Sequence, residues 1–514
     1  MALASPSLTH EVRDWRGVAS TDVRTLALFG VLVVVLHIVA NGRYGFHRDE
    51  LQTFTNARQL AWGYVEYPPV TAVAGRIELE LFGTSLRGFR LIPALTQGLV
   101  FLLTGLMART LGAQREGQFV AATGAAIGGA PLVYGGFLSY TSLDFFVWML
   151  VAYFVVRLLA SNNPRWWLAV GASIGVGFLT KYSIAFLALG VIAGMLLTEQ
   201  RRYFRSPWFW YGVAAAALIT LPNLLWQARH QFVTLQYLQS IHARDIRWGW
   251  TDHFLLNQLW KTAHPVTVPL WGAGLWFLFA TEDGKRYRML GWMYLLALAS
   301  LMAARGRDYY LAPAYPMLIA CGATYVERWM RSLGPAAQES VRGWLWWSLA
   351  TGGVIGAALV LPIAPIGTAW WRLANAANGN FHYEIGYREL VRQVAKIRDG
   401  LPERRTGIGI LAGDDGQAGA VNLYGQEFGL PQAISGMNSN WLRGYGSPAP
   451  QTVIAVGMDP EFLQRNFESC QYMGTQTRPF GIQNHALSFY PDLFVCRNLR
   501  KSWQEFWRGN QYYG

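Results

Sequence analysis

The sequence predicts a mostly α-helical, polytopic membrane protein with a small α/β domain at its C-terminal end. Of the 514 residues, 52% are hydrophobic and only 14% are charged, whereas a soluble domain carries about 25% charged residues. Apolar runs long enough to cross a bilayer recur up to about residue 366. After that point the chain becomes more polar and alternates short β-rich runs with helical patterns, which is typical of an α/β domain.

Apolar runs define the predicted transmembrane part. We expect eleven spans, at 24–41, 89–108, 118–136, 143–160, 166–180, 183–199, 207–227, 264–280, 288–304, 309–325 and 343–364. The pair 166–180 and 183–199 is the least regular, because Lys181 marks a turn between two short helices.

The basic residues predict the orientation. With the N-terminus inside, every short inner segment is basic: Arg13, Arg16, Arg24; Arg109, Arg115; Arg157, Arg165; Arg201, Arg202, Arg205; Lys285, Arg286, Arg288; Arg328, Arg331, Arg342. The short outer connections contain only Lys181, Arg305 and Arg307. An odd number of spans then places the chain after about residue 367 outside. Residues 1–21 show no cleavage pattern, so we expect no removable signal peptide.

The net charge of +13 does not indicate nucleic-acid binding, because the basic residues fall in short clusters between apolar runs. Cys321 lies in an apolar run and is expected to be a core residue. Cys470 and Cys496 lie in the polar C-terminal part, and the sequence leaves open whether they form a disulfide. No Cys or His spacing predicts a metal site.

Two parts of the chain are therefore expected. Residues 1–366 form a transmembrane module with long outer loops at 41–88 and 228–263, whose mixed composition predicts helices lying in the interface, one of them at 58–62. Residues 367–514 form an outer α/β domain. Its expected strands are 407–411, 452–456 and 493–497, and its expected helices are 387–398, 417–424 and 460–466.

Charged and aromatic residues gather on the outer face in this topology. Asp49 and Glu50 follow the first span, and charge near lipid must be solvated or paired. A carboxylate there can accept the proton of an attacking hydroxyl, while Arg and Lys stabilise an anionic leaving group. A sugar-bearing lipid phosphate has such a leaving group, and the chain has no P-loop or dinucleotide fingerprint.

Each of these residues also has a purely structural interpretation. Asp49 and Glu50 could pair with Arg48 and Arg58 on a solvated helix. Asp144 could be a helix cap or a topology marker. Lys181 could be a lysine that snorkels to the interface. The Gly-Asp-Asp-Gly turn at 413–416 is favoured as a capped turn over a ligand site.

Several short motifs recur in a recognisable order on this face. They are Arg48-Asp49-Glu50-Leu51, Tyr64-Val65-Glu66-Tyr67-Pro68-Pro69-Val70, Leu81-Phe82-Gly83-Thr84-Ser85-Leu86-Arg87-Gly88-Phe89-Arg90-Leu91, Ser139-Tyr140-Thr141-Ser142-Leu143-Asp144, Gly175-Val176-Gly177-Phe178-Leu179-Thr180-Lys181-Tyr182, Leu221-Pro222-Asn223-Leu224-Leu225-Trp226-Gln227 and Tyr309-Tyr310-Leu311-Ala312-Pro313. Over about residues 20–325 the chain resembles the bacterial branch of glycosyltransferase family 39, in the GT-C class. This family includes protein O-mannosyltransferases and the aminoarabinose transferase of lipid A.

The resemblance implies roles for individual residues. Asp49 matches the general base of the family, Glu50 its acidic neighbour, and Asp144 a second acid near the site. Lys181, Arg307 and Tyr310 match positions close to the donor phosphate. Tyr64 and Tyr67 lie in the loop that covers the donor.

One position departs from the family pattern. In the lipid A branch, a lysine that contacts phosphate precedes the two prolines, and here that residue is Tyr67. Another cation is then needed, and the candidates are Arg76, His264 and Arg307. The difference bears on which donor and acceptor the protein uses.

The predicted function is that of an inverting hexosyl or pentosyl transferase. It would move a sugar from a polyprenyl phosphate to a hydroxyl on a lipid, glycan or protein at the outer face of the bacterial cytoplasmic (inner) membrane. Donor binding is compatible with a divalent metal ion but requires none. The alternative is a transporter or flippase for lipid-linked sugars, but the charges cluster at one surface and no repeat is seen.

Overall fold

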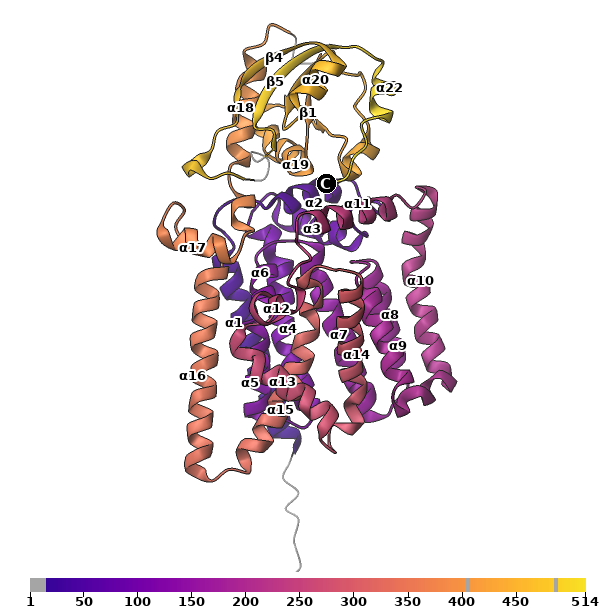
Figure 1. The fold of residues 1–514 in the computed structure, drawn as a ribbon, viewed down its shortest axis with the longest axis vertical. Coiled ribbons are helices and arrows are strands. Elements are labelled where there is room, and N and C mark those ends of the chain that lie inside the picture. The colour runs from indigo at the N-terminus through magenta and orange to yellow at the C-terminus, as the bar shows by residue number, and fades with distance from the viewer. Residues whose placement is uncertain (1–14, 404–406, 485–488) are drawn as a thin grey trace, which may run out of the picture.

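The computed structural model describes residues 15–403, 407–484 and 489–514, so Arg13 and most of the segment expected to lack a signal peptide lie outside it. A long helical bundle carries an α/β layer at one end, and short helices lie between the two (Figure 1). The chain passes from the bundle to the α/β layer through α17 (Ala369–Ala377) and η7 (Phe381–Glu384).

Helices occupy each apolar run of the bundle. They are α1 (Trp15–Ala40), α4 (Leu91–Thr110), α5 (Arg115–Ala126), α6 (Gly129–Tyr134), α7 (Tyr140–Ser161), α8 (Trp166–Phe178), α9 (Ile184–Leu196), α10 (Pro207–Arg229), α13 (Val268–Ala280), α14 (Arg288–Ala303), α15 (Tyr315–Arg331) and α16 (Pro335–Val360). Within the described residues, 5 helical segments are long and apolar enough to cross a membrane, or 6 if a bent pair counts as one span. Several expected spans are therefore short or broken helices, and the number eleven stays a prediction.

Burial separates central from peripheral helices. In the most apolar stretch of each long helix, 61% of the residues are buried in α4 and 67% in α7. The corresponding values are 22% in α1, 22% in α10 and 17% in α16. The exposed side chains of these outer helices are mostly apolar, as expected for surfaces that face lipid. Where α8 and α10 meet, a Cβ on Gly171 would clash with the backbone of Gly212, so this close approach depends on small residues.

Three short helices lie across the end of the bundle: α2 (Arg48–Arg58), α3 (Val70–Phe82) and α11 (Val233–Arg247) (Figure 1). The prediction of a helix at 58–62 is wrong, because α2 ends at Arg58. The Tyr64 hydroxyl hydrogen-bonds the backbone at Asn56, Gln59 and Ala61. This side chain therefore takes over the backbone groups that a continuing helix would pair.

The C-terminal α/β layer contains one mixed sheet with the strand order β2-β1-β3-β5-β4 among the described residues. The strands are β1 (Ile408–Ala412), β2 (Ala433–Ile434), β3 (Thr452–Val456), β4 (Phe467–Thr475) and β5 (Asp492–Leu499), and the main helices are α18 (Tyr387–Asp399), α19 (Asp415–Tyr424), α20 (Pro460–Asn466) and α22 (Trp503–Arg508). β1, β2 and β3 are parallel, while β5 is antiparallel to β3 and β4. The three expected strands and three expected helices are present; β2, β4 and α22 were not predicted.

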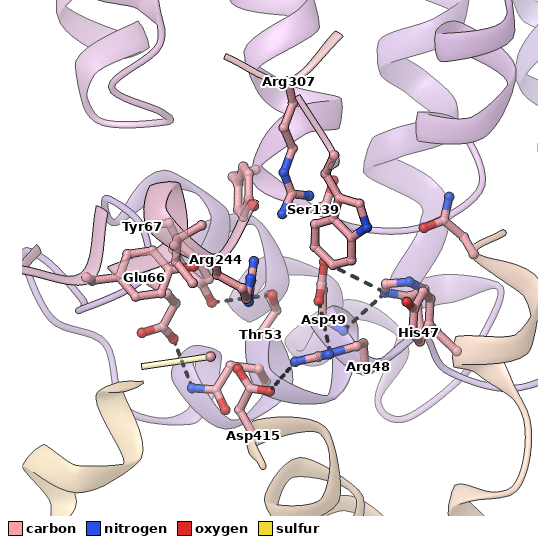
Figure 2. A pocket seen from close by; sticks show the side chains of 18 of the residues that line it. His47, Arg48, Asp49, Thr53, Glu66, Tyr67, Ser139, Arg244, Arg307 and Asp415 are labelled. Carbon is pink, nitrogen blue, oxygen red and sulfur yellow. Dashed lines mark hydrogen bonds and ion pairs between the residues drawn. The ribbon is translucent and has the colours of Figure 1, made fainter. Parts of the chain in front are cut away.

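The connection that follows β1 and the connection that follows β3 lead to opposite edges of the sheet. β1 leads through α19 to the neighbouring β2, whereas β3 leads through α20 to β4 on the other side. Ligands of open α/β sheets bind at such a point, beyond the carboxyl ends of the strands. In this protein, helix α2 lies at that point of the sheet. A Cβ atom on Gly419 of α19 would lie 2.4 Å from the backbone of Leu51 in α2, and the side chains of Arg48 and Asp415 form an ion pair of 3.1 Å (Figure 2).

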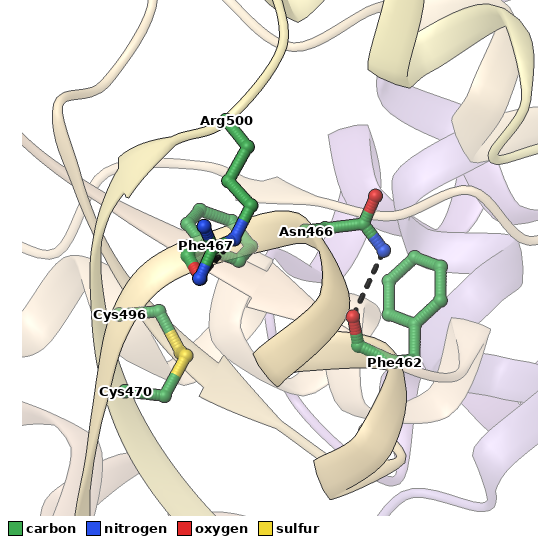
Figure 3. The surroundings of a disulfide bond; sticks show 6 residues. All are labelled: Phe462, Asn466, Phe467, Cys470, Cys496 and Arg500. Carbon is green, nitrogen blue, oxygen red and sulfur yellow. Dashed lines mark hydrogen bonds between the residues drawn. A yellow bond between two sulfur atoms is a disulfide. The ribbon is translucent and has the colours of Figure 1, made fainter.

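A disulfide joins the two antiparallel strands at the far edge of the sheet. Cys470 of β4 and Cys496 of β5 face each other in register and are bonded (Figure 3). Of the two alternatives left open by the sequence, the structure thus has the bonded one. Cys321 is fully buried, as expected for a core residue.

Candidate active site

The first turn of α2 is held by reciprocal hydrogen bonds. The Asp49 backbone N–H donates to Nδ1 of His47, at 3.1 Å, and the His47 backbone N–H donates to the Glu50 carboxylate, at 2.8 Å. This capping box fixes both acidic residues at the helix N-terminus, where the helix dipole favours negative charge. The two carboxylates then leave the helix toward different surroundings.

Glu50 points into a closed layer of charged groups. Its carboxylate accepts bonds from Arg90 at 2.7 and 2.9 Å and from the Leu138 backbone N–H at 3.0 Å, and the Glu50 and Arg90 side chains are both 0% exposed. Arg90 also contacts Glu384, at 3.3 Å. Glu50 was predicted as catalytic, but it does not line the pocket described next. Its acceptor sites are occupied by the framework, which explains the difference.

A pocket of about 180 Å³ lies between the bundle, the short helices and the α/β layer. Its lining is polar and aromatic: His47, Arg48, Asp49, Gln52, Thr53, Glu66, Tyr67, Ser139, Tyr140, Tyr237, Ile241, Arg244, Trp250, Arg307, Tyr310, Asn380, Tyr383, Asp415 and Gly514. In Figure 2, Arg307 and Asp415 lie at opposite ends of the pocket and Asp49 lies between them. Distant segments of the chain thus converge on one small volume.

Asp49 faces this pocket. Its side chain is 46% exposed, and the nearest basic groups, Arg48 and His47, are 3.8 and 3.9 Å away. The surrounding pocket walls raise the pKa of Asp49 through burial, although Arg48, Arg307 and Arg244 act in the opposite direction. A carboxylate with open acceptor positions and raised proton affinity is suited to accept a proton from a hydroxyl.

Two arginines form the cationic wall. Arg307 holds Asp245 through two hydrogen bonds of 2.5 and 2.6 Å, and its guanidinium lies 4.6 Å from the ring centre of Trp250. Arg244 contacts the same carboxylate at 3.1 Å. Asp245 therefore neutralises part of the charge and fixes both side chains at the pocket wall. Both guanidiniums line the pocket, where their positive charge would favour an anionic phosphate.

Asp144 and Lys181 lie behind the pocket wall. Asp144 accepts a hydrogen bond of 3.0 Å from Ser183, and the Lys181 ammonium lies 3.9 Å from the ring centre of Tyr310 and 5.2 Å from that of Tyr140. Burial lowers the pKa of Lys181 to about 8, although Asp144 opposes the shift. Neither residue lines the pocket, and the rings of Tyr140 and Tyr310 pack on Lys181. The two predicted residues therefore lie in a buried layer next to the pocket.

The tyrosine and arginine predictions have different outcomes. Tyr67 lines the pocket and its hydroxyl hydrogen-bonds Asn56, at 2.6 Å, whereas Tyr64 is buried and does not line it. Arg76 does not reach the pocket: it lies on the exposed side of α3, paired with Glu80 at 2.5 Å.

Arg76, His264 and Arg307 were the candidates to replace the lysine that the family has before the two prolines. Of these three, only Arg307 lines the pocket. His264 caps a short helical turn, η4 (Pro265–Thr267), and lines a separate groove beside α16. Arg244 is a second cation at the wall. In the part of the chain that the structure describes, no group of three or more His, Cys, Asp or Glu residues is suited to hold a metal ion.

Most of the pocket residues were not predicted as site residues, and four examples are Tyr237, Asn380, Tyr383 and Asp415. Tyr237 lies on the amphipathic helix α11, whose other face exposes Leu235 and Leu238. Asn380 and Tyr383 lie in the connection between the two layers and belong to no motif. Only Asp415 carried a signal, the Gly-Asp-Asp-Gly turn, and that was interpreted as a capped turn.

Comparison with known proteins bears on the family. Residues 66–226 match the family model described as dolichyl-phosphate-mannose-protein mannosyltransferase. The family resemblance is confirmed. Two curated relatives agree with it: a lipid A galacturonosyltransferase, RgtD, of Rhizobium johnstonii, 29% identical over 51% of this chain and 56% of the relative, and an undecaprenyl phosphate-aminoarabinose arabinosyl transferase of Pseudomonas fluorescens, 26% identical over 43% and 46%. The chain spans about half the length of the curated relatives it matches.

A solved structure extends the likeness to the whole fold. The crystal structure of ArnT from Cupriavidus metallidurans bound to undecaprenyl phosphate is 14% identical, with a TM-score of 0.55 over 92% of this chain and 98% of ArnT. At this identity the match establishes a shared, mostly helical GT-C fold and no more.

Proposed function

We propose that the protein is an inverting glycosyltransferase that moves a sugar from a polyprenyl phosphate to a hydroxyl group. The observation that carries this proposal is the pocket in which Asp49, with open acceptor positions, shares a small volume with Arg307 and Arg244. The relatives named above act on lipid A or use an undecaprenyl phosphate donor. The sugar and the acceptor, whether lipid, glycan or protein, are left open.

The reaction follows from this placement. The acceptor oxygen attacks the anomeric carbon and Asp49 takes its proton, while the bond from that carbon to the phosphate oxygen breaks on the opposite side. Polyprenyl phosphate leaves with the bonding electron pair. Arg307 and Arg244 lie where donors to the growing charge on the phosphate are needed. Lys181, beneath the tyrosine rings, adds positive charge to the same side.

The proposed location of the protein is the bacterial inner membrane. The basic inner loops support a multi-pass protein of the bacterial inner membrane, with about eleven spans and a cytoplasmic N-terminus. Residues 367–514 would then form an extracytoplasmic domain and residues 1–366 the transmembrane catalytic module. The transporter alternative would require charges at mid-membrane, whereas the charges of this site lie at one end of the bundle.

Lipid binding tests the proposal directly. Purified protein should retain undecaprenyl phosphate in native mass spectrometry, and mass spectrometry of co-purifying lipid should find a polyprenyl phosphate carrying a sugar. R307A should weaken retention about tenfold, because charge-assisted hydrogen bonds to phosphate are lost. R76A removes the same charge outside the pocket and should bind like wild type. Equal retention by R307A and wild type would contradict the assignment of the phosphate to this wall.

A further inference from the structure

Asp415 reaches the pocket from the α/β layer. It is the first residue of α19, where Asp414 caps the helix by accepting a 2.7 Å bond from the Gln417 backbone N–H. The Asp415 side chain is 11% exposed and lines the same pocket as Asp49. One carboxylate oxygen lies 3.1 Å from the Arg48 guanidinium, and the other accepts a 2.9 Å bond from Asn438. Asp415, which lies 366 positions after Asp49 in the sequence, therefore holds the side chain of Arg48, the neighbour of Asp49.

We infer that the α/β layer supplies a positioning residue to the transferase site: Asp415 holds Arg48 and sets how much of its positive charge acts on Asp49. This inference rests on the proposed function for its meaning, since Asp49 is the proposed base. It assigns the C-terminal layer a part in the chemistry, in addition to any part in the fold.

The contact belongs to a built interface. Glu66 accepts hydrogen bonds from the Ser439 hydroxyl and backbone N–H, and Asn440 donates to Gln52 at 2.9 Å. The Val65 backbone N–H donates to the Ser439 hydroxyl at 2.9 Å. These groups are buried or partly buried, so the α/β layer is docked on the loop that carries Asp49 by several directional contacts. Such docking fixes the position of Asp415 relative to α2.

Arg48 lies between two carboxylates. Its guanidinium is 3.1 Å from Asp415 and 3.8 Å from Asp49. The charged and titratable groups facing Asp49 come from several elements: Arg48 and His47 from its own segment, Arg244 from α11, Arg307 at the N-cap of η6 (Asp308–Ala314), Tyr140 from α7, Tyr383 from η7 and Tyr387 from α18. Three of these groups are cations that favour the charged carboxylate. Asp415 opposes the effect of Arg48, because its carboxylate lies 3.1 Å from the same guanidinium and neutralises part of that charge.

Removal of this charge should therefore lower the proton affinity of Asp49. The variant D415N keeps the shape and a hydrogen-bonding oxygen, but removes the negative charge closest to Arg48; Asp414 and Asp49 still act on that guanidinium. Water-soluble carbodiimide modifies protonated carboxyl groups, so the rate of Asp49 modification against pH reports its titration by peptide mass spectrometry. We expect the midpoint to move to lower pH by about one unit in D415N, equivalent to about tenfold in proton affinity.

Two further variants isolate the cause. Asp459 caps α20 in the same layer and does not line the pocket, and asparagine is an equally good cap, so D459N should leave the midpoint unchanged. In an R48Q background, D415N should shift the midpoint less than in wild type. An unmoved midpoint in D415N, or an equal shift in D459N, would overturn the inference.

Transfer measurements separate this inference from the proposed function. The acid limb of the kcat profile should move to lower pH in D415N together with the carbodiimide midpoint. Absence of transfer in wild type would contradict the proposed function, while the chemical titration of Asp49 would still decide whether Asp415 acts on it.

Discussion

Helix α2 has two neighbouring acidic residues with opposite surroundings. Asp49 is 46% exposed and faces a pocket with two arginines on its far wall. Glu50 is 0% exposed and its carboxylate is occupied by Arg90 and two backbone N–H groups. One residue keeps acceptor positions for a substrate, and the other uses all of them to join the short helices to the bundle.

The difference separates two uses of buried charge. A carboxylate whose partners are all supplied by the protein stabilises one arrangement of the chain, and breaking it leaves an unpaired charge. A carboxylate in a water-poor pocket with incomplete partners has a raised pKa and can exchange a proton. Single substitutions on the same helix turn should therefore separate the proton-accepting role of Asp49 from the stabilising role of Glu50.

The largest expected effect is on turnover in D49N. Loss of a general base costs about 10²–10⁴-fold, and we expect kcat for transfer from a polyprenyl-phosphate sugar to fall within this range. The melting temperature and retention of undecaprenyl phosphate should stay close to wild type. Turnover equal to wild type would contradict the role of Asp49, and E50Q is the adjacent control for the second face of the helix.

E50A should act on stability. Among the described residues, it leaves Glu384 as the remaining acidic partner of the buried Arg90 guanidinium, and breaking a buried ion pair costs about 3–5 kcal/mol. We expect a correspondingly lower thermal midpoint in detergent, read by light scattering and by tryptophan fluorescence. The double variant E50A/R90M should recover part of the loss, because it removes the unpaired charge. If E50A melted like wild type but lost turnover, Glu50 would belong with Asp49.

The same layer predicts a pH dependence. Burial raises the pKa of Glu384 to about 8; Arg90 opposes the shift and Glu50 adds to it. Because the folded state holds this proton more tightly than the unfolded state does, stability should fall as pH rises from about 4.5, the ordinary value, to about 8. E384Q should flatten the dependence of the melting temperature on pH in this window. A slope unchanged in E384Q would assign the dependence to another group.

The sequence was sufficient for most helices of the bundle and for three strands of the sheet. The helices follow from apolar runs, which act through local transfer energies. The sequence analysis placed Glu50 in the catalytic group beside Asp49, since adjacent acids in one motif carry no mark of their partners. Arg90, which decides the role of Glu50, is 40 residues away in sequence.

Part of the unpredicted lining comes from the connection and the α/β layer. Asn380, Tyr383 and Asp415 reach the pocket only through docking of that layer on α2. Local pattern predicted the turn at Asp415 as a helix cap, and Asp414 does cap α19. The neighbouring carboxylate faces the pocket because of tertiary packing, which no local pattern encodes. Strand β4 was missed for a similar reason: most of it is partly or fully exposed, and its place in the sheet depends on pairing with β5.

The smallest expected effect concerns His47, whose hydrogen bonds hold Asp49 and Glu50 in the first turn of α2. His47 accepts from the Asp49 backbone through Nδ1, and burial, with Arg48 and Arg90, lowers its pKa well below the ordinary value, so the cap persists at neutral pH. H47A should cost about 0.5–2 kcal/mol, the usual value of an N-cap. H47N keeps a cap acceptor and should recover most of that stability. Since the cap orients both acids, H47A should lower both turnover and melting temperature, whereas D49N lowers only the first and E50A mainly the second. Restoration of stability by H47N without restoration of turnover would show that the imidazole, which lines the pocket and packs on Phe137 at 4.3 Å, contributes to the site beyond capping.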